Sequence, residues 1–111
     1  MLMLPAPPYT AVIFSAQRTT EDDEGYLATA ARMEELARSQ PGYLGIESAR
    51  NRDGFGITVS YWRTPADARS WKAVAEHAAA QERGRSTWYE AYDVRVATVE
   101  RAYPDPARRP D

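Results

Sequence analysis

An Asp-Gly pair between two β-rich runs constrains this sequence more than any other single feature. Residues 43–49 and 55–63 carry many aromatic and β-branched side chains, and the short segment between them ends in Asp53-Gly54. Asp-Gly favours the tight turn of a β-hairpin, because the central positions of that turn need a positive φ. The two runs are therefore predicted to pair as neighbouring antiparallel strands.

Two amphipathic helices are predicted, one on each side of this hairpin. The first follows the acidic residues 21–24, which suit the positive end of a helix dipole, with Thr20 as the N-cap. The second begins at residues 64–67 (TPAD), with Thr64 as the cap, and ends near Gly84. The predicted core-facing positions are Tyr26, Thr29, Ala30, Met33, Leu36 and Ala37 on the first helix, and Ala68, Trp71, Val74, Ala75 and Ala78 on the second.

The first and the last strand of the sequence complete the pattern. Residues 9–17 are apolar almost throughout, which favours a central strand, and residues 94–102 form the last predicted strand. Proline runs cannot join a sheet ladder or continue a helix, and prolines bracket this body on both sides. We therefore expect a proline-rich tail over residues 1–8, one domain over residues 9–103, and a Pro/Arg tail over residues 104–111.

The order β-α-β-β-α-β is typical of the ferredoxin-like α+β fold, in which both helices cover one face of an antiparallel sheet. Strand 55–63 places Phe55, Ile57, Val59 and Tyr61 on one face and Gly56, Thr58, Ser60 and Trp62 on the other, and neither face is hydrophilic. A monomer would leave the second apolar face in water. We therefore predict a homodimer that packs through its sheets, with Tyr61 and Trp62 pointing to opposite sides.

Composition excludes several classes of protein. Without cysteine there is no disulfide, thiolate metal site or cysteine nucleophile. A net charge of -2 without a basic stripe argues against nucleic acid, and a single histidine without a carboxylate cluster argues against a dedicated metal site. No apolar run has the length of a membrane span or the form of a signal peptide, so we expect a cytoplasmic protein that binds no membrane.

His77 is the first candidate for a catalytic base, because histidine is the side chain that ordinarily titrates near neutral pH. It lies at the edge of the buried stripe of the second helix, one turn before Gln81. A second interpretation stays open, in which His77 and Gln81 hydrogen-bond to the connection from Gly84 to Tyr89 and hold it in place. The same alternatives apply to the tryptophans, since Trp62, Trp71 and Trp88 either line a cavity or fill the core.

Several strings of this sequence resemble the antibiotic biosynthesis monooxygenase family, specifically its short bacterial members. They are QPGYLGIES at residues 40–48, GITVSYW at residues 56–62, Trp71-Lys72 with Glu76-His77 and Gln81, and Gly84-Arg85 with Trp88-Tyr89. The resemblance spans nearly all of residues 9–103. It implies a dimeric α+β barrel, in which two ferredoxin-like protomers pack sheet to sheet and a cavity lies between the helices and the sheet of each protomer.

The resemblance implies a monooxygenase that uses no cofactor and acts on a small aromatic substrate of phenolic or quinol type. A deprotonated, electron-rich substrate itself reduces oxygen, so the protein need supply only a dry aromatic pocket and hydrogen bonds that favour the anion. The expected catalytic residues are His77 and Trp71, and the expected substrate-binding residues are Phe14, Tyr26, Trp62, Gln81 and Trp88.

Two alternatives remain beside this expectation. The first is a non-catalytic domain that binds or senses a small ligand in the same cavity. The second is a haem-degrading monooxygenase, as in a related branch of the family. Trp71 falls where that branch has its pocket tryptophan, but Gln81 stands where its haem-ligating histidine lies. The strand-one asparagine of the branch has no counterpart among Ile13, Phe14 and Ser15.

Overall fold

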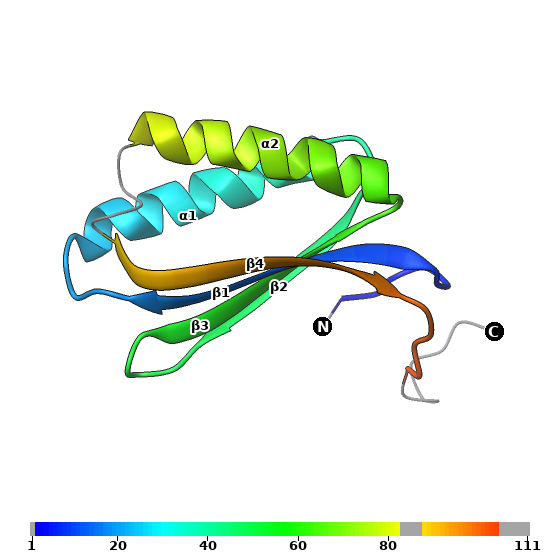
Figure 1. Ribbon diagram of the computed structural model, residues 1–111, viewed down its shortest axis with the longest axis horizontal. Helices are drawn as coiled ribbons and strands as arrows, with labels where there is room; N and C mark the ends of the chain where they lie inside the picture. Colours follow the sequence, from blue (N-terminus) through cyan, green and yellow to red (C-terminus); the bar gives the residue numbers. More distant parts are fainter. Residues whose placement is uncertain (1, 83–87, 105–111) are drawn as a thin grey trace.

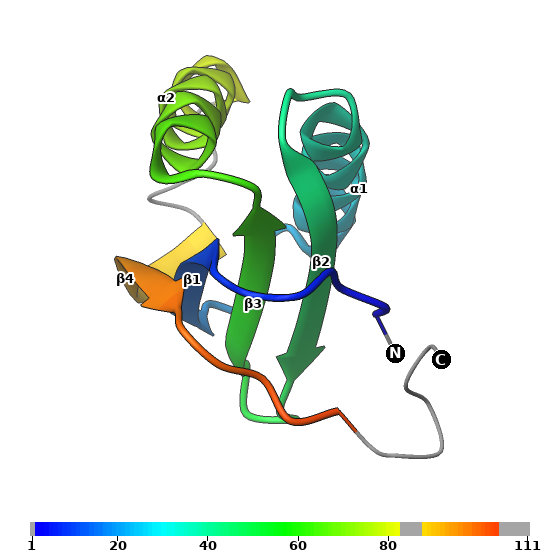
Figure 2. The same ribbon diagram turned by 90° about the vertical axis from the view of Figure 1, so that its right-hand side faces the viewer.

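A four-stranded antiparallel sheet carries both helices on one face in the computed structural model, which describes residues 2–82 and 88–104, without the side chains of residues 79–82 (Figures 1 and 2). The strand order is β2-β3-β1-β4, which confirms the ferredoxin-like α+β fold. No described helix has the length and apolar character needed to span a membrane. The elements are β1 (Tyr9–Arg18), α1 (Asp23–Arg38), β2 (Tyr43–Arg50), β3 (Phe55–Trp62), α2 (Pro65–Glu82) and β4 (Tyr89–Val99).

The register of β1 against β3 decides which side chains face the helices. Thr10 lies opposite Trp62, and Ala16 lies opposite Gly56, so alternate residues of both strands share the helix-facing side. Trp62 points into the core there, whereas the Tyr61 ring packs edge-on against Tyr9 on the second side, 5.8 Å between ring centroids. The prediction that these neighbours point to opposite sides is confirmed.

Two indoles fill the core between the helices and the sheet. Trp62 has no exposed surface and stacks on Trp71 of α2, with ring centroids 5.6 Å apart and an interplanar angle of 22°. Its Nε1 donates to Ser60 Oγ at 2.9 Å, so the buried N–H is satisfied. Ala37 of α1 and Ala68 of α2 have no exposed surface either, and these small side chains leave room for the indoles.

The predicted start of α2 is confirmed, because Asp67 N donates to Thr64 Oγ1 at 3.1 Å and Pro65 is the first helical residue. Thr20 as the cap of α1 is wrong. The N-cap is Asp22, whose Oδ1 accepts from Gly25 N at 3.1 Å. Thr19 N donates to Trp88 O at 2.8 Å, so the chain is still held against the start of β4 and turns into the helix only afterwards.

The last strand begins five residues earlier than its predicted start at Val94. Residues 89–99 pair with β1 along its whole length, from Arg18 opposite Tyr89 to Tyr9 opposite Val99. The predicted start leaves Tyr89 and Tyr92 outside the strand, but their rings pack on Phe14 of the neighbouring strand. Cross-strand aromatic packing therefore extends β4, and this gain is invisible in the local sequence. The predicted end of α2 near Gly84 lies outside the described residues.

The N-terminal segment crosses the second face of the sheet (Figure 2). The Leu2 side chain lies over Gly45, where an added Cβ would stand 2.9 Å from Leu2 Cδ1. Tyr9 and Ala11 at this end of β1 are buried. At the other end of the same face, Phe55 is 40% exposed and Ile57 is 41% exposed, so large apolar side chains are uncovered there.

Candidate active site

The structure separates the predicted site residues into two groups. Trp62 and Trp71 form the buried pair in the middle of the core. Phe14 lies in the second half of β1, Tyr26 in the first turn of α1 and Trp88 directly before β4, toward the end of the sheet where β1 ends. Phe14 and Tyr26 are half-buried and Trp88 is buried, so Phe14 and Tyr26 are more accessible than the two core indoles.

Five rings at this end form a continuous series, which we call the aromatic chain. Its members touch in sequence as edge-to-face or stacked pairs, a geometry that stabilises aromatic clusters beyond simple burial. The ring centroids are 6.1 Å apart for Trp88–Tyr26, 5.9 Å for Tyr26–Tyr89, 5.3 Å for Tyr89–Phe14 and 5.7 Å for Phe14–Tyr92.

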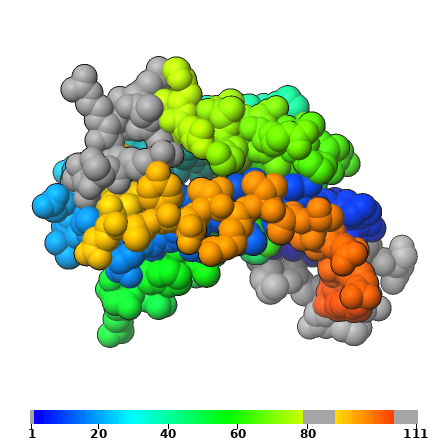
Figure 3. Space-filling view, viewed as in Figure 1, coloured from blue at the N-terminus to red at the C-terminus, as the bar shows by residue number. Residues whose placement is uncertain are grey.

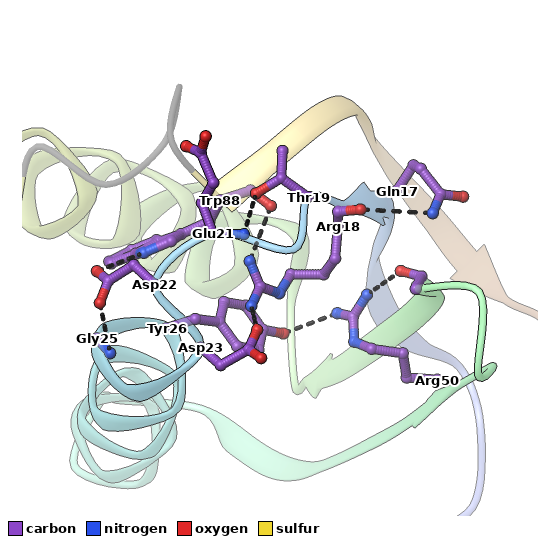
Figure 4. Close-up of polar contacts among 11 residues, drawn as sticks. Gln17, Arg18, Thr19, Glu21, Asp22, Asp23, Gly25, Tyr26, Arg50 and Trp88 are labelled. Atoms are coloured by element: carbon purple, nitrogen blue, oxygen red, sulfur yellow. Dashed lines mark hydrogen bonds and ion pairs between the residues drawn. The ribbon is translucent and has the colours of Figure 1, made fainter.

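Arg18 joins three elements at the Tyr26 end of the aromatic chain (Figure 4). Its guanidinium carbon lies 3.9 Å from the centroid of the Tyr26 ring, within the range of a cation–π contact. Nη1 donates to Trp88 O at 3.0 Å, and Nη2 forms an ion pair with Asp23 Oδ1 at 2.6 Å. The Arg18 side chain is only 6% exposed, so the Asp23 carboxylate balances a buried charge.

Arg50 approaches the same tyrosine from β2. Its Nη2 donates to the Tyr26 hydroxyl at 2.7 Å, and its Nη1 donates to Gly54 O at 2.5 Å. Tyr26 therefore has one guanidinium over its ring face and another bound to its oxygen, as the close-up in Figure 4 shows. Both contacts place a guanidinium against the Tyr26 side chain.

Asp22 ties the beginning of β4 to α1. Its Oδ2 accepts from Trp88 Nε1 at 3.1 Å while its Oδ1 caps the helix at Gly25 N. The residue adopts the left-handed conformation, with φ 52° and ψ 53°, which is uncommon for a residue other than glycine. The indole contact and the cap together stabilise this conformation, and they fix Trp88 beside Tyr26.

Tyr89 supplies a second phenol next to Tyr26. Burial raises the pKa of Tyr89, and the proximity of the Tyr26 hydroxyl and hydrogen bonding with it raise that pKa further, while Arg50 and Arg18 act weakly in the opposite direction. Tyr89 is therefore protonated at neutral pH and available as a hydrogen-bond donor.

An exposed apolar strip continues the aromatic chain along β4. Val94 pairs with Phe14 and Val96 pairs with Val12, so these side chains lie on the helix-facing side. Tyr92 is 40% exposed, Val94 is 37% exposed and Val96 is 48% exposed. β4 lies at the molecular surface alongside α2 in Figure 3. An apolar ligand therefore has access to this strip.

His77 is exposed on α2, and it adjoins the buried Ala78. Gln81 belongs to α2, but its side chain lies outside the described residues. Residues 84–87 of the connection to which His77 and Gln81 were predicted to hydrogen-bond also lie outside them. The catalytic role of His77 stays a prediction. Among the described residues, no group of three or more His, Asp or Glu side chains is placed to hold a metal ion.

Arg18, Arg50 and Tyr89 were not predicted as site residues. One signal was available, because Arg18 continues the helix-facing alternation of Phe14 and Ala16 and so places a charge beneath the helices. An open hollow of about 200 Å³ lies at the opposite end of the sheet, beside Pro65 and Arg63. None of the predicted site residues lines it.

Fold and site together define the class of protein. It is a ferredoxin-like α+β domain with a chain of aromatic rings and two arginines at one end of its sheet. The chain belongs to the antibiotic biosynthesis monooxygenase family, whose sequence pattern matches residues 9–83. The resemblance seen in the sequence is therefore confirmed.

Two relatives and one solved structure illustrate the likeness. The uncharacterised protein YqjZ of Bacillus subtilis is 57% identical over 97 residues, covering 87% of this chain and 84% of YqjZ. The jasmonate monooxygenase ABM of Pyricularia oryzae is 31% identical over 93 residues, which are 80% of this chain but only 42% of that protein. SnoaB, a cofactor-independent oxygenase from Streptomyces nogalater, superposes with a TM-score of 0.71 at 14% identity, covering 89% of this chain and 100% of SnoaB.

Proposed function

We propose that the protein is a cofactor-independent monooxygenase of a small aromatic substrate, of phenolic or quinol type. The observation that carries the proposal is the aromatic chain, which offers ring faces for stacking beside the Tyr26–Arg50 hydrogen bond. Family membership supports an oxygenase, and SnoaB, described as a cofactor-independent oxygenase, shares the fold. A monooxygenase also occurs among the sequence relatives.

The chemistry follows from the substrate. A base removes a proton from an acidic C–H or O–H, and the resulting anion transfers electrons to dioxygen. For an anthrone-type substrate, the CH₂ group and O₂ yield a carbonyl and water, so the substrate supplies both electrons that reduce the second oxygen atom. The protein binds the ring, excludes water and favours the anion. His77 and Trp71 stay our proposed catalytic residues, although Trp71 stacks on Trp62 in the core and is not a member of the aromatic chain.

Oxygen uptake tests this function directly. With a panel of quinols and anthrones, we expect uptake above background, and His77→Ala is expected to lower it by about 100-fold if the imidazole is the general base. Lys72→Ala is a matched control, since it lies on the same helix, pairs with Glu76 and is expected to leave uptake unchanged. Background uptake with the whole panel would overturn the proposal.

A non-catalytic small-ligand-binding domain is the second candidate. The exposed strip of Tyr92, Val94 and Val96 favours it, because an apolar ligand can bind there without being turned over. Ligand-induced quenching of tryptophan fluorescence without any oxygen uptake is the result that would favour binding over catalysis.

We also propose a homodimer that packs sheet to sheet. Phe55 and Ile57 expose large apolar side chains on the face away from the helices, at the end that the N-terminal segment leaves uncovered. Sedimentation at micromolar concentration is expected to give twice the 12.5 kDa chain mass, and Ile57→Arg is expected to give the chain mass. A wild-type mass of 12.5 kDa would contradict the dimer.

A further inference from the structure

Two phenol hydroxyls come together where the aromatic chain meets the arginines. Tyr26 accepts a hydrogen bond from Arg50 at 2.7 Å, and Tyr89 lies beside it with ring centroids 5.9 Å apart. The Tyr26 oxygen accepts from the guanidinium, and the two hydroxyls hydrogen-bond to each other, so the pair keeps one proton for an outside acceptor. This pair therefore presents a hydroxyl donor backed by positive charge.

The two arginines differ in the partners that the described residues give them. Arg18 is balanced by Asp23, but the hydrogen bonds of Arg50 within the described part of the chain go to a carbonyl and a phenol, not to a carboxylate. A hydrogen bond that involves a charged group is roughly twice as strong as one between neutral groups. An anionic oxygen near Tyr26 would therefore gain from both the hydroxyl and the guanidinium behind it.

The rest of the aromatic chain defines the other half of a ligand. Phe14 and Tyr92 stack on each other, and Val94 continues the same side of the sheet, so this end accepts a flat apolar ring. A ligand that covers both ends has an aromatic ring at the Phe14 end and an acidic oxygen at the Tyr26 end. Phenols and enols have this form.

We propose that the Tyr26 hydroxyl, with Tyr89 beside it, donates a hydrogen bond to the ionised oxygen of a phenolic or enolic ligand, and that Arg50 is a positioning residue that holds Tyr26 in this role. The proposal rests on the proposed function in placing the ligand on the aromatic chain. It adds the residues that select the anion over the neutral molecule.

The test uses 4-nitrophenol, whose anion is yellow, and measures binding under nitrogen so that no turnover takes place. The wild-type protein is expected to bind the anion more tightly than the neutral molecule. Tyr26→Phe keeps the ring beneath Arg18 but removes the hydroxyl, so the affinity for the anion is expected to fall about 10-fold, which corresponds to about 1.4 kcal/mol. The affinity for the neutral probe, measured at lower pH, is expected to change less than about twofold.

Tyr43→Phe is the matched control. The hydrogen bond with Tyr43, followed by the charge of Glu34, raises the pKa of Arg38, so this variant also removes a tyrosine hydroxyl that contacts an arginine. Tyr43 packs on Trp62 in the core, outside the aromatic chain. We expect its affinity for the anion to equal that of the wild type.

A second variant separates positioning from the mere presence of the arginine. A Cβ at Gly56 would lie 2.8 Å from Arg50 Cζ, so Gly56→Ala displaces the guanidinium while keeping both Arg50 and Tyr26. The anion affinity is expected to fall several-fold, and Arg50→Gln is expected to have the same effect.

The outcomes keep this proposal apart from the oxygenase proposal. Equal binding of anion and neutral probe by the wild type, no binding of either, or an unchanged preference in Tyr26→Phe would overturn the role of Tyr26. An unchanged preference in both Gly56→Ala and Arg50→Gln would overturn the role of Arg50. Anion selectivity without oxygen uptake would leave the binding site in place and remove the oxygenase.

Discussion

Replacing Trp62 with alanine is expected to lower the free energy of unfolding by about 3–5 kcal/mol. The indole has no exposed surface and contacts both Trp71 of α2 and Tyr43 of β2. Its removal leaves a cavity between the helices and the sheet, and domains of this kind have only about 5–15 kcal/mol of stability in total. Urea unfolding monitored by far-ultraviolet circular dichroism measures the change.

The adjoining Tyr61 provides the control for this prediction. Tyr61→Phe removes a hydroxyl that donates to Glu47 Oε1 at 2.8 Å on the second face, and we expect a cost of about 1 kcal/mol or less. Trp62→Phe keeps an aromatic ring and should fall between the two. A cost below about 1 kcal/mol for Trp62→Ala would contradict the stacked pair as the centre of the core.

Gly42→Ala is expected to cost about 2–3 kcal/mol. Gly42 has a φ of 80°, and an alanine pays roughly 1–2 kcal/mol in this left-handed region. Its Cβ would also lie 2.1 Å from Asp67 Oδ2, so this carboxylate would have to move. Asp67 accepts a hydrogen bond from the Thr64 hydroxyl, and disturbing this cap costs about 1 kcal/mol. The same unfolding assay applies.

A double-mutant cycle with Asp67→Ala separates the two causes. Shortening Asp67 relieves part of the clash, so Gly42→Ala is expected to cost less in that background than in the wild type. The cost that remains reports the strained φ. Strictly additive effects would show that the alanine does not meet Asp67.

The sequence predicted the fold well because its decisive signals are local. The turn at Asp53-Gly54, the cap at Thr64 and the alternation of β3 each depend on residues close together in the chain. The starts of α1 and β4 were wrong for the opposite reason. Asp22 is supported by the Trp88 indole, 66 residues away, and no local pattern reports that contact.

The candidate site was predicted only in part. Periodicity tells which face of the sheet a side chain occupies, but not how far along the strand it lies. Trp62 and Phe14 were therefore assigned to one site, although the first lies in the core and the second in the aromatic chain. The contact of Arg50 with Tyr26 joins residues 24 apart on different elements, so it depends on the tertiary fold.

Arg18 also bears on the excess of arginine over lysine in the composition. The chain has 14 basic residues, of which only Lys72 is lysine, a bias that by itself says nothing about structure. At Arg18, however, one planar group binds Trp88 O and Asp23 while its carbon lies 3.9 Å from the centroid of the Tyr26 ring. A lysine ammonium cannot do all three, because it is a compact point charge without a flat face. Substitution between arginine and lysine has little effect on the exposed surface. At position 18, a lysine would lose contacts that hold the fold together.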